Sequence, residues 1–379
     1  MKLLHIADLH IGKRVGGLSM IEEQKNVIAQ LEALAKTEDI EAVLIAGDVF
    51  DRPVPSHEAL ETCESLFSAF CENGIDVFVI PGNHDSSQQL AFCSHLLAPS
   101  GLHIAKAFDG HIETHTLDDG KDRVCIHLLP FIRPTDVRMA LAEKADEIST
   151  HEDAVSAALS QDKIDEAAFN ILVAHQFVTS GDERPETSDS EIMSVGGSDN
   201  VDASLFDAYD YVALGHLHRA QHIGRPHIRY AGSPLKYSFS ETQHEKSATL
   251  LEISAGSLEV KTHPLKPLHD MREIKASYEE LRQGIDTKSN EDYMRVTLTD
   301  SSLADAMAKL RAIYPNILRL DWEGFAEPVQ HEAQGSGRTE NVSPIELFEE
   351  YYEKQTSSKL DQTELRAVKA SFDADGAVK

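Results

Sequence analysis

Cysteine is rare in this chain of 379 residues, and the basic residues Lys and Arg are few compared with the acidic ones. Its four cysteines, Cys63, Cys71, Cys93 and Cys125, form no Cys-x-x-Cys pair, and a chain of this length needs no disulfide bonds for stability. We therefore expect buried thiols. The sequence gives no support for a thiolate zinc site.

Long apolar runs are also missing. No run approaches the roughly 18 residues that span a bilayer, and the first residues enter an apolar segment without the pattern of a signal peptide. We therefore expect a cytoplasmic protein.

Acidic residues outnumber basic ones by 64 to 35, which gives a formal net charge of -29. This charge argues against a surface that is basic overall and binds nucleic acid by charge alone. With 41% hydrophobic residues, the chain can build a large core, and its length suggests two or three domains.

Five apolar segments end in an Asp, Asn or His. The segments are L-L-H-I-A-D-L-H with Asp8 and His10, A-V-L-I-A-G-D with Asp48, V-F-V-I-P-G-N-H-D with Asn83 to Asp85, I-L-V-A-H with His175, and Y-V-A-L-G-H-L-H with His216 and His218. Continuous apolar runs of about four to six residues are typical of buried strands in an α/β sheet. Open α/β sheets place their active sites at the edge where loops leave the strand ends, so the pattern predicts a binuclear metal site.

Carboxylates, an amide oxygen and imidazoles suit Mn²⁺, Fe²⁺ or Zn²⁺ better than Ca²⁺, which prefers oxygen throughout. A carboxylate can bridge two ions, and Asp48 on a central strand is the expected bridge. The predicted ligands of one ion are Asp8, His10, Asp48 and His218, and those of the other are Asp48, Asn83, His175 and His216. Two such ions can activate a shared water and stabilise the attacking and leaving oxygens in phosphoryl transfer.

His84 follows the predicted ligand Asn83 and is expected to be a catalytic residue rather than a ligand. Its imidazole would donate a proton or a hydrogen bond to the developing charge, and Asp85 would orient that imidazole. Any one of these residues alone is explained more simply as a satisfied polar group at a strand end, and Gly-Asn-His-Asp alone as a turn. Taken together, the five segments predict metal binding.

The segments also outline the domains. Helical patterns from Ser19, as the first residue of a Ser-x-x-Glu capping box, and from Ser56 alternate with the first three strands, which predicts parallel pairing with crossover helices. Short strands after His218 predict an antiparallel end to a sandwich. The expected domains are a first domain over residues 1–267, a small α+β domain over 268–325, a linker over 326–342 and C-terminal helices over 343–379.

The motifs that carry the ligands resemble those of the calcineurin-like metallophosphoesterases. They are Asp8-Leu9-His10, Gly47-Asp48-Val49-Phe50-Asp51, Gly82-Asn83-His84-Asp85, Ala174-His175 and Gly215-His216-Leu217-His218. Around the last motif, Arg219 to Gln221, Tyr230 to Leu235 and Ser238-Phe239 are similar to one branch of that family, the bacterial nuclease subunits that act with the coiled-coil ATPase SbcC. Some archaeal relatives have a His where this chain has Asp51, so a second catalytic histidine is not implied.

The resemblance implies an α/β fold, a four-layer β-sandwich flanked by helices, with a small capping domain that helps to hold DNA. It implies Mn²⁺-dependent cleavage of DNA, as a 3'-5' exonuclease on double strands and an endonuclease on single strands and hairpins, in DNA repair, replication and recombination. Two Mn²⁺ per chain are implied as cofactors. The implied partners are DNA and SbcC, in a heterotetramer with two copies of each and with the C-terminal helices on the coiled coil; a homodimer of this chain is also implied.

Two other functions use the same motifs. A phosphatase or nucleotide phosphodiesterase could be built on the same scaffold, but it has no obvious need for a linker followed by partner-binding helices. A scaffold without catalysis would be expected to lose ligands first, whereas this chain has the complete set.

Overall fold

The computed structural model describes residues 1–191, 199–323 and Leu365. The chain divides into two compact units, Met1–Met271 and Arg272–Lys379. The predicted linker (326–342) and C-terminal helices (343–379) lie outside the described residues, apart from Leu365. Among the helices that are described, none is long and apolar enough to cross a membrane.

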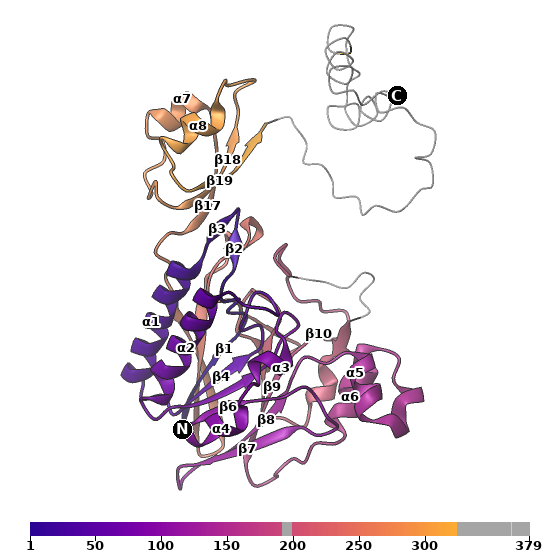
Figure 1. The fold of residues 1–379 in the computed structure, drawn as a ribbon. Coiled ribbons are helices and arrows are strands. Elements are labelled where there is room, and N and C mark those ends of the chain that lie inside the picture. Colours follow the sequence, from indigo (N-terminus) through magenta and orange to yellow (C-terminus); the bar gives the residue numbers. More distant parts are fainter. Residues whose placement is uncertain (192–198, 324–364, 366–379) are drawn as a thin grey trace. The chain divides into compact units, whose positions relative to one another are not determined.

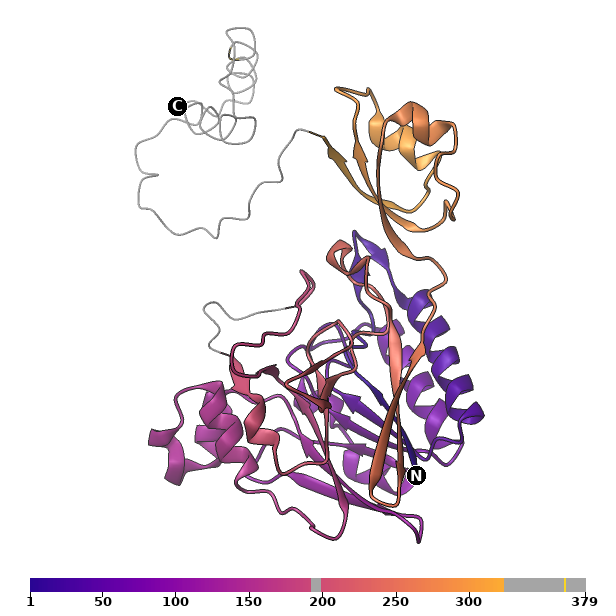
Figure 2. The same ribbon diagram turned by 180° about the vertical axis from the view of Figure 1, so that it is seen from behind.

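The first unit contains two six-stranded sheets (Figure 1). The first sheet has the order β16-β15-β1-β4-β5-β6 and consists of β1 (Lys2–Ile6), β4 (Ala42–Ala46), β5 (Asp76–Ile80), β6 (Leu102–Ile104), β15 (Ser247–Ser254) and β16 (Ser257–Pro264). Strands β1, β4, β5 and β6 are parallel, with α1 (Ile21–Thr37) and α2 (His57–Cys71) as crossovers. The predicted parallel pairing is thus confirmed, and so is an antiparallel end, the β15–β16 hairpin seen from behind in Figure 2.

The second sheet has the order β13-β14-β12-β9-β8-β7. Its strands are β7 (Glu113–Asp118), β8 (Arg123–Leu129), β9 (Phe169–His175), β12 (Tyr211–Gly215), β13 (Gln221–Ile223) and β14 (Arg225–Tyr230). The central strands β8, β9, β12 and β14 are parallel, and β7 and β13 are antiparallel to their neighbours. Helices α5 (Pro134–Ala140) and α6 (His151–Leu159) connect β8 to β9.

Apolar side chains fill the space between the layers. Leu44 and Phe78 of the first sheet pack with Ile126 and Val173 of the second. A further cluster places Val137 of α5 and Val155 of α6 with the second sheet, and Figure 1 shows α1 and α2 beside the first sheet. The four-layer sandwich that the sequence implies is therefore present.

Short elements complete the first unit. They are β2 (Arg14–Val15), β3 (Leu18–Ser19), α3 (Ser87–Leu90), α4 (Ser94–Leu97), β10 (Phe177–Thr179), β11 (Asn200–Asp202) and the 3-10 turns Ala98–Ser100, Ala142–Glu147, Ala203–Phe206 and Phe239–Glu241. Ser56 caps α2 by accepting a hydrogen bond from the Ala59 N–H, as predicted. The capping box at Ser19 was wrong: Ser19 belongs to β3, and α1 begins after Met20 without a side-chain cap.

The second unit has its own core. Its sheet has the order β17-β18-β19, formed by β17 (Met271–Ala276), β18 (Tyr293–Leu298) and β19 (Ile317–Trp322), with α7 (Tyr278–Arg282) and α8 (Ala306–Arg311). Leu281, Met294, Leu310 and Tyr314 are buried together. This unit is a small α+β body.

Candidate metal centre

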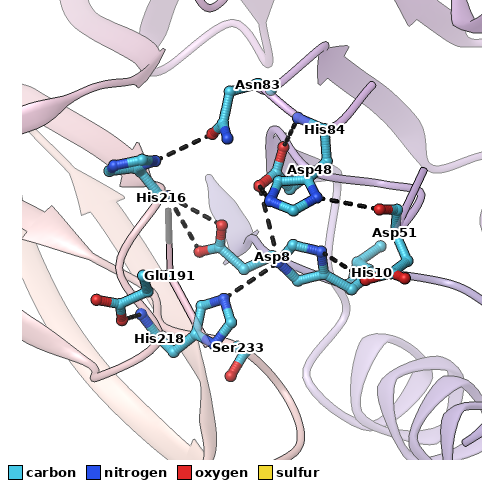
Figure 3. A network of polar contacts seen from close by, with 12 residues as sticks. Asp8, His10, Asp48, Asp51, Asn83, His84, Glu191, His216, His218 and Ser233 are labelled. Carbon is cyan, nitrogen blue, oxygen red and sulfur yellow. Dashed lines mark hydrogen bonds and ion pairs between the residues drawn. The ribbon is translucent and has the colours of Figure 1, made fainter. Parts of the chain in front are cut away.

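The predicted ligands come from the carboxyl ends of strands in both sheets. Asp8 and His10 follow β1, Asp48 follows β4 and Asn83 follows β5, whereas His175 ends β9, and His216 and His218 follow β12. These strand ends meet, and Figure 3 shows six of the seven side chains converging from opposite sides. The structure therefore brings together residues that are more than 200 positions apart in the chain.

The side chains form overlapping clusters with Asp48 between them. Its Oδ2 lies 3.7 Å from His10 Nε2 and 3.4 Å from His175 Nε2. Asn83 Oδ1 lies 3.0 Å from His175 Nε2 and 3.1 Å from His216 Nδ1. In Asp8-His10-His218 and Asp8-Asp48-His175, the potential ligand atoms of each group all lie within 4.8 Å of one another. Asp48 thus faces both predicted ligand sets.

The donor set fits divalent ions. His10 Nε2 and His218 Nε2 face each other at 3.1 Å, and the carboxylates of Asp8 and Asp48 lie beside them, 0% and 2% exposed. Buried carboxylates need a compensating cation, and opposed imidazole nitrogens of this kind offer lone pairs to a metal. The residues present therefore fit divalent metal ions.

Comparison with known proteins agrees with this geometry. The sequence model of the family described as calcineurin-like phosphoesterase matches residues 1–220, more than half of the chain. The chain belongs to this family. A second model, described as type 5 capsule protein repressor C-terminal domain, matches residues 267–356.

This phosphoesterase is also similar to a curated nuclease subunit. It is 32% identical to SbcD, the D chain of the nuclease SbcCD of Staphylococcus epidermidis, over 386 aligned positions that cover 97% of each chain, and therefore belongs to the same family. Among solved structures, it resembles a dimetal phosphatase from Danio rerio (13% identity, TM-score 0.43, 70% of this chain and 96% of that one). It also resembles a protein of Thermus thermophilus (12% identity, TM-score 0.39, 69% and 98%).

The backbone of the phosphoesterase site is held in unusual conformations. Asp8, His10, Asp48 and His216 have φ of 53°, 44°, 50° and 103°. A left-handed conformation costs an L-residue roughly 1–2 kcal/mol, and such strain persists where the surroundings impose it. Its concentration at four predicted ligands indicates that the loops are shaped for the site.

Electrostatic interactions couple the buried groups. Burial raises the pKa of Asp8, and the Asp48 charge adds to this effect, although His175 opposes it. Burial would also raise the pKa of Asp48, but His175, His10 and His84 outweigh burial and hold that pKa well below its usual range. The pKa of His175 rises to about 9 because Asp48 and Asp8 outweigh the burial of its imidazole. Asp48 and His175 thus favour each other's charged forms inside the cluster.

His84 lies at the rim of this cluster. Its Nδ1 is 3.0 Å from the carbonyl oxygen of Asp51, and its Nε2 is 4.0 Å from Asp48 Oδ2. Asp85, which we expected to orient the imidazole, instead accepts hydrogen bonds from the backbone N–H groups of Val49, Phe50 and Gly82. The Asp51 carbonyl is therefore the observed partner of the ring, and Asp85 joins the loops that carry Asp48 and Asn83.

Two residues that the sequence analysis missed support the first ligand loop. Gln24 Nε2 donates to the carbonyl oxygens of Leu9 and His10, at 3.1 and 2.8 Å, and the Tyr237 hydroxyl donates to that of Leu9. Gln24 is 3% exposed and lies on the buried face of α1. A polar residue inside an apolar helical stripe was the signal that could have identified it.

Proposed function

We propose that this chain is the metal-dependent nuclease subunit of an SbcCD-type complex and cleaves phosphodiester bonds in DNA. The observation that carries the proposal is the assembled ligand cluster in a chain that aligns over 97% of its length with a nuclease subunit. Exonuclease cleavage of double strands in the 3'-5' direction, endonuclease cleavage of single strands and hairpins, and a role in DNA repair, replication and recombination belong to this proposal.

The proposed cofactors are two Mn²⁺ ions per chain. Asp48 would be shared between them, with Asp8, His10 and His218 on one side and Asn83, His175 and His216 on the other. Bound ions of this kind supply Lewis-acid activation of water and stabilise charge on the phosphoryl oxygens. The protein itself fixes the ligands, because six of the seven side chains are buried and four of these residues have a positive φ that the surrounding loops impose.

His84 is the proposed catalytic residue of the chain. When its imidazole is protonated, Nδ1–H donates to the Asp51 carbonyl and Nε2–H remains to donate to the substrate. That donor can stabilise the developing negative charge or protonate the leaving oxygen. Asp85 keeps a supporting role, because it joins the Asp48 and Asn83 loops on either side of His84.

The proposed partners are DNA and the ATPase SbcC, in a cytoplasmic heterotetramer with two copies of each subunit. Residues 343–379 would bind the coiled coil of SbcC after the linker 326–342, and residues 268–325 would form the capping domain. A homodimer of this chain belongs to the same assembly. The S. epidermidis relative, whose name places it in an SbcCD complex, supports this part of the proposal.

The deciding experiment is a cleavage assay with Mn²⁺ on blunt and hairpin DNA duplexes, with and without SbcC and ATP. We expect Mn²⁺-dependent degradation that SbcC and ATP modulate, and end-labelled strands will report the polarity. Because the family includes phosphoesterases in general, the alternative is a phosphatase or nucleotide phosphodiesterase. Cleavage of nucleotides or phosphoproteins with none of DNA would overturn the nuclease proposal.

A further inference from the structure

The ring nitrogen of His218 that does not face His10 contacts groups that are not among the predicted ligands. Its Nε2 faces His10 Nε2, whereas its Nδ1 points away from the cluster. Glu241 Oε1 lies 3.2 Å from that Nδ1, and Ser190 Oγ lies 2.8 Å from it. An Nδ1–H group can therefore donate hydrogen bonds to these oxygens, which leaves the Nε2 lone pair for a metal.

Glu241 is itself fixed by a buried cation. The Glu241 side chain is fully buried, and its Oε2 lies 2.6 Å from Lys246 Nζ, whose side chain is 5% exposed. Lys246 Nζ also donates to the backbone carbonyl of His218 and to Ser233 Oγ, each at 2.8 Å. An ammonium group has three N–H donors, and here each one has an acceptor.

These contacts hold both ends of His218. Glu241 contacts the imidazole at Nδ1, and Lys246 donates a hydrogen bond to the backbone carbonyl oxygen. The Ser190 hydroxyl donates to Glu241 Oε1 at 2.5 Å, so its oxygen can accept a hydrogen bond from His218 Nδ1–H. The imidazole is thereby restricted in rotation and in tautomer.

We propose that Glu241 and Lys246 are positioning residues for His218 and hold its imidazole with Nε2 turned toward the metal centre. The inference rests on the metal-dependent function proposed above and deepens it. It also gives a physical role to the segment that follows Tyr230 to Phe239, a stretch with no ligand of its own. Hydrogen bonds to the distal nitrogen of a metal-binding imidazole typically change metal affinity by about 10–100-fold.

The alternative is that Glu241 and Lys246 form an ion pair that stabilises the fold and has no effect on metal binding. A double variant and a matched control distinguish this structural role from the positioning role. Glu241→Gln or Lys246→Met alone leaves one buried charge without its partner and can prevent folding. The double variant Glu241→Gln with Lys246→Met removes both charges while keeping similar side-chain volumes. Asp162→Asn is the matched control, because Asp162 makes a 2.8 Å contact with His127 Nδ1 outside the metal cluster.

Calorimetric titration of the full-length, metal-free protein with Mn²⁺ provides the test, together with thermal unfolding of each variant. We expect the double variant to bind one of two Mn²⁺ ions about 10–100-fold more weakly, and Asp162→Asn to keep both affinities. Wild-type affinity at both sites in a folded double variant would overturn the proposal. Equal weakening at both sites, in proportion to lost stability, would also overturn it.

A measurement on the wild-type chain makes the test independent of how the variants fold. Nitrogen-15 NMR of the metal-free protein reports the histidine tautomers, and His218→Asn assigns the His218 signals. We expect a proton on Nδ1 and none on Nε2, whereas an Nε2–H tautomer would refute the proposal. Because neither readout uses DNA cleavage, failure of this inference is distinguishable from failure of the nuclease proposal.

Discussion

Among single residues, His84 is the one whose removal should separate catalysis from metal binding. It stands beside the cluster, and its ring is oriented by the Asp51 carbonyl rather than by a predicted ligand. We expect His84→Ala to lower single-turnover DNA cleavage by about 10²–10⁴-fold, the usual contribution of a positioned acid or base. Calorimetry should show Mn²⁺ affinity within about twofold of wild type.

The exposed His222 offers the control, because His222→Ala removes an imidazole from β13 without touching the cluster. Its cleavage rate should stay at the wild-type value. If His84→Ala instead loses Mn²⁺ in proportion to its activity, His84 is a ligand and our assignment is wrong.

His5 should make the metal-free protein sensitive to acid. Burial lowers its pKa to about 3, and the nearby Arg229 charge adds to this effect. In the unfolded chain the pKa is about 6.5, so the unfolded state binds the proton first. The contribution of neutral His5 to the free energy of unfolding is therefore fully present above pH 6.5 and is lost as the pH falls toward 3.

Each pH unit inside that window costs about 1.4 kcal/mol, so His5 should remove roughly 3 kcal/mol between pH 7 and pH 4. Between pH 7 and pH 4, the free energy of unfolding of His5→Leu should therefore fall by about that much less than that of the wild type. The Tyr211 hydroxyl loses its 3.0 Å partner in this variant at every pH, which does not change the pH dependence. Urea unfolding at both pH values measures the difference. An unchanged pH dependence in the variant would show that other groups cause the acid loss.

The residues that could be predicted from sequence share one property. Asp8, Asn83 and His216 each follow a continuous buried strand, so period and position indicate both the element and the edge on which the side chain lies. Glu241 and Lys246 have no such context: Glu241 ends the short 3-10 turn Phe239–Glu241, Lys246 lies just before β15, and both contact His218 only through the tertiary fold. The partners of Asp85 were missed for a related reason: local sequence does not show which backbone N–H groups of a distant loop will donate to a carboxylate.

At the level of secondary structure, the loop after β5 has room for glycine alone. A Cβ on Gly82 would lie 2.1 Å from Asp48 Oδ1 and 2.4 Å from the Asp48 backbone nitrogen. The variant Gly82→Ala must therefore push apart the loops that carry Asp48 and Asn83. We expect Mn²⁺ binding to weaken by more than about tenfold, the lower limit of the range for disturbed ligand support.

Gly120→Ala is the matched change, because a Cβ there meets nothing within 4 Å. With a φ of 80°, it should cost about 1 kcal/mol of stability and leave metal titration unchanged. Tight Mn²⁺ binding by Gly82→Ala would mean that the strand ends can separate without disturbing the ligands.

The two helix starts illustrate how far local patterns reach. Ser56 and Ser19 both have capping chemistry, but Ser56 alone caps a helix. Ser19 pairs with Arg14 in the β2–β3 hairpin, and this pairing competes with the cap. A capping motif identifies helix-forming sequence, whereas competing strand pairing decides which residue is first.

For the whole chain, the C-terminal region should be separable from the chemistry. The predicted ligands and His84 all lie within the first unit, Met1–Met271. Deleting residues 343–379 should abolish co-purification with SbcC and preserve Mn²⁺-dependent cleavage without ATP. Complex formation by the truncated chain, measured by size-exclusion chromatography, would refute the predicted role of this region.

The position of β1 in its sheet has a consequence for synthesis of the protein. Strand β1 lies between β4 and β15, so one of its neighbours is translated about 35 residues later and the other about 240 residues later. A nascent chain therefore keeps one edge of a largely apolar strand open for most of its translation, which is a recognised hazard for misassembly. His216 and His218 are also translated late. The predicted ligand set that contains Asp8 and Asp48 is therefore incomplete until more than half of the chain has been synthesised.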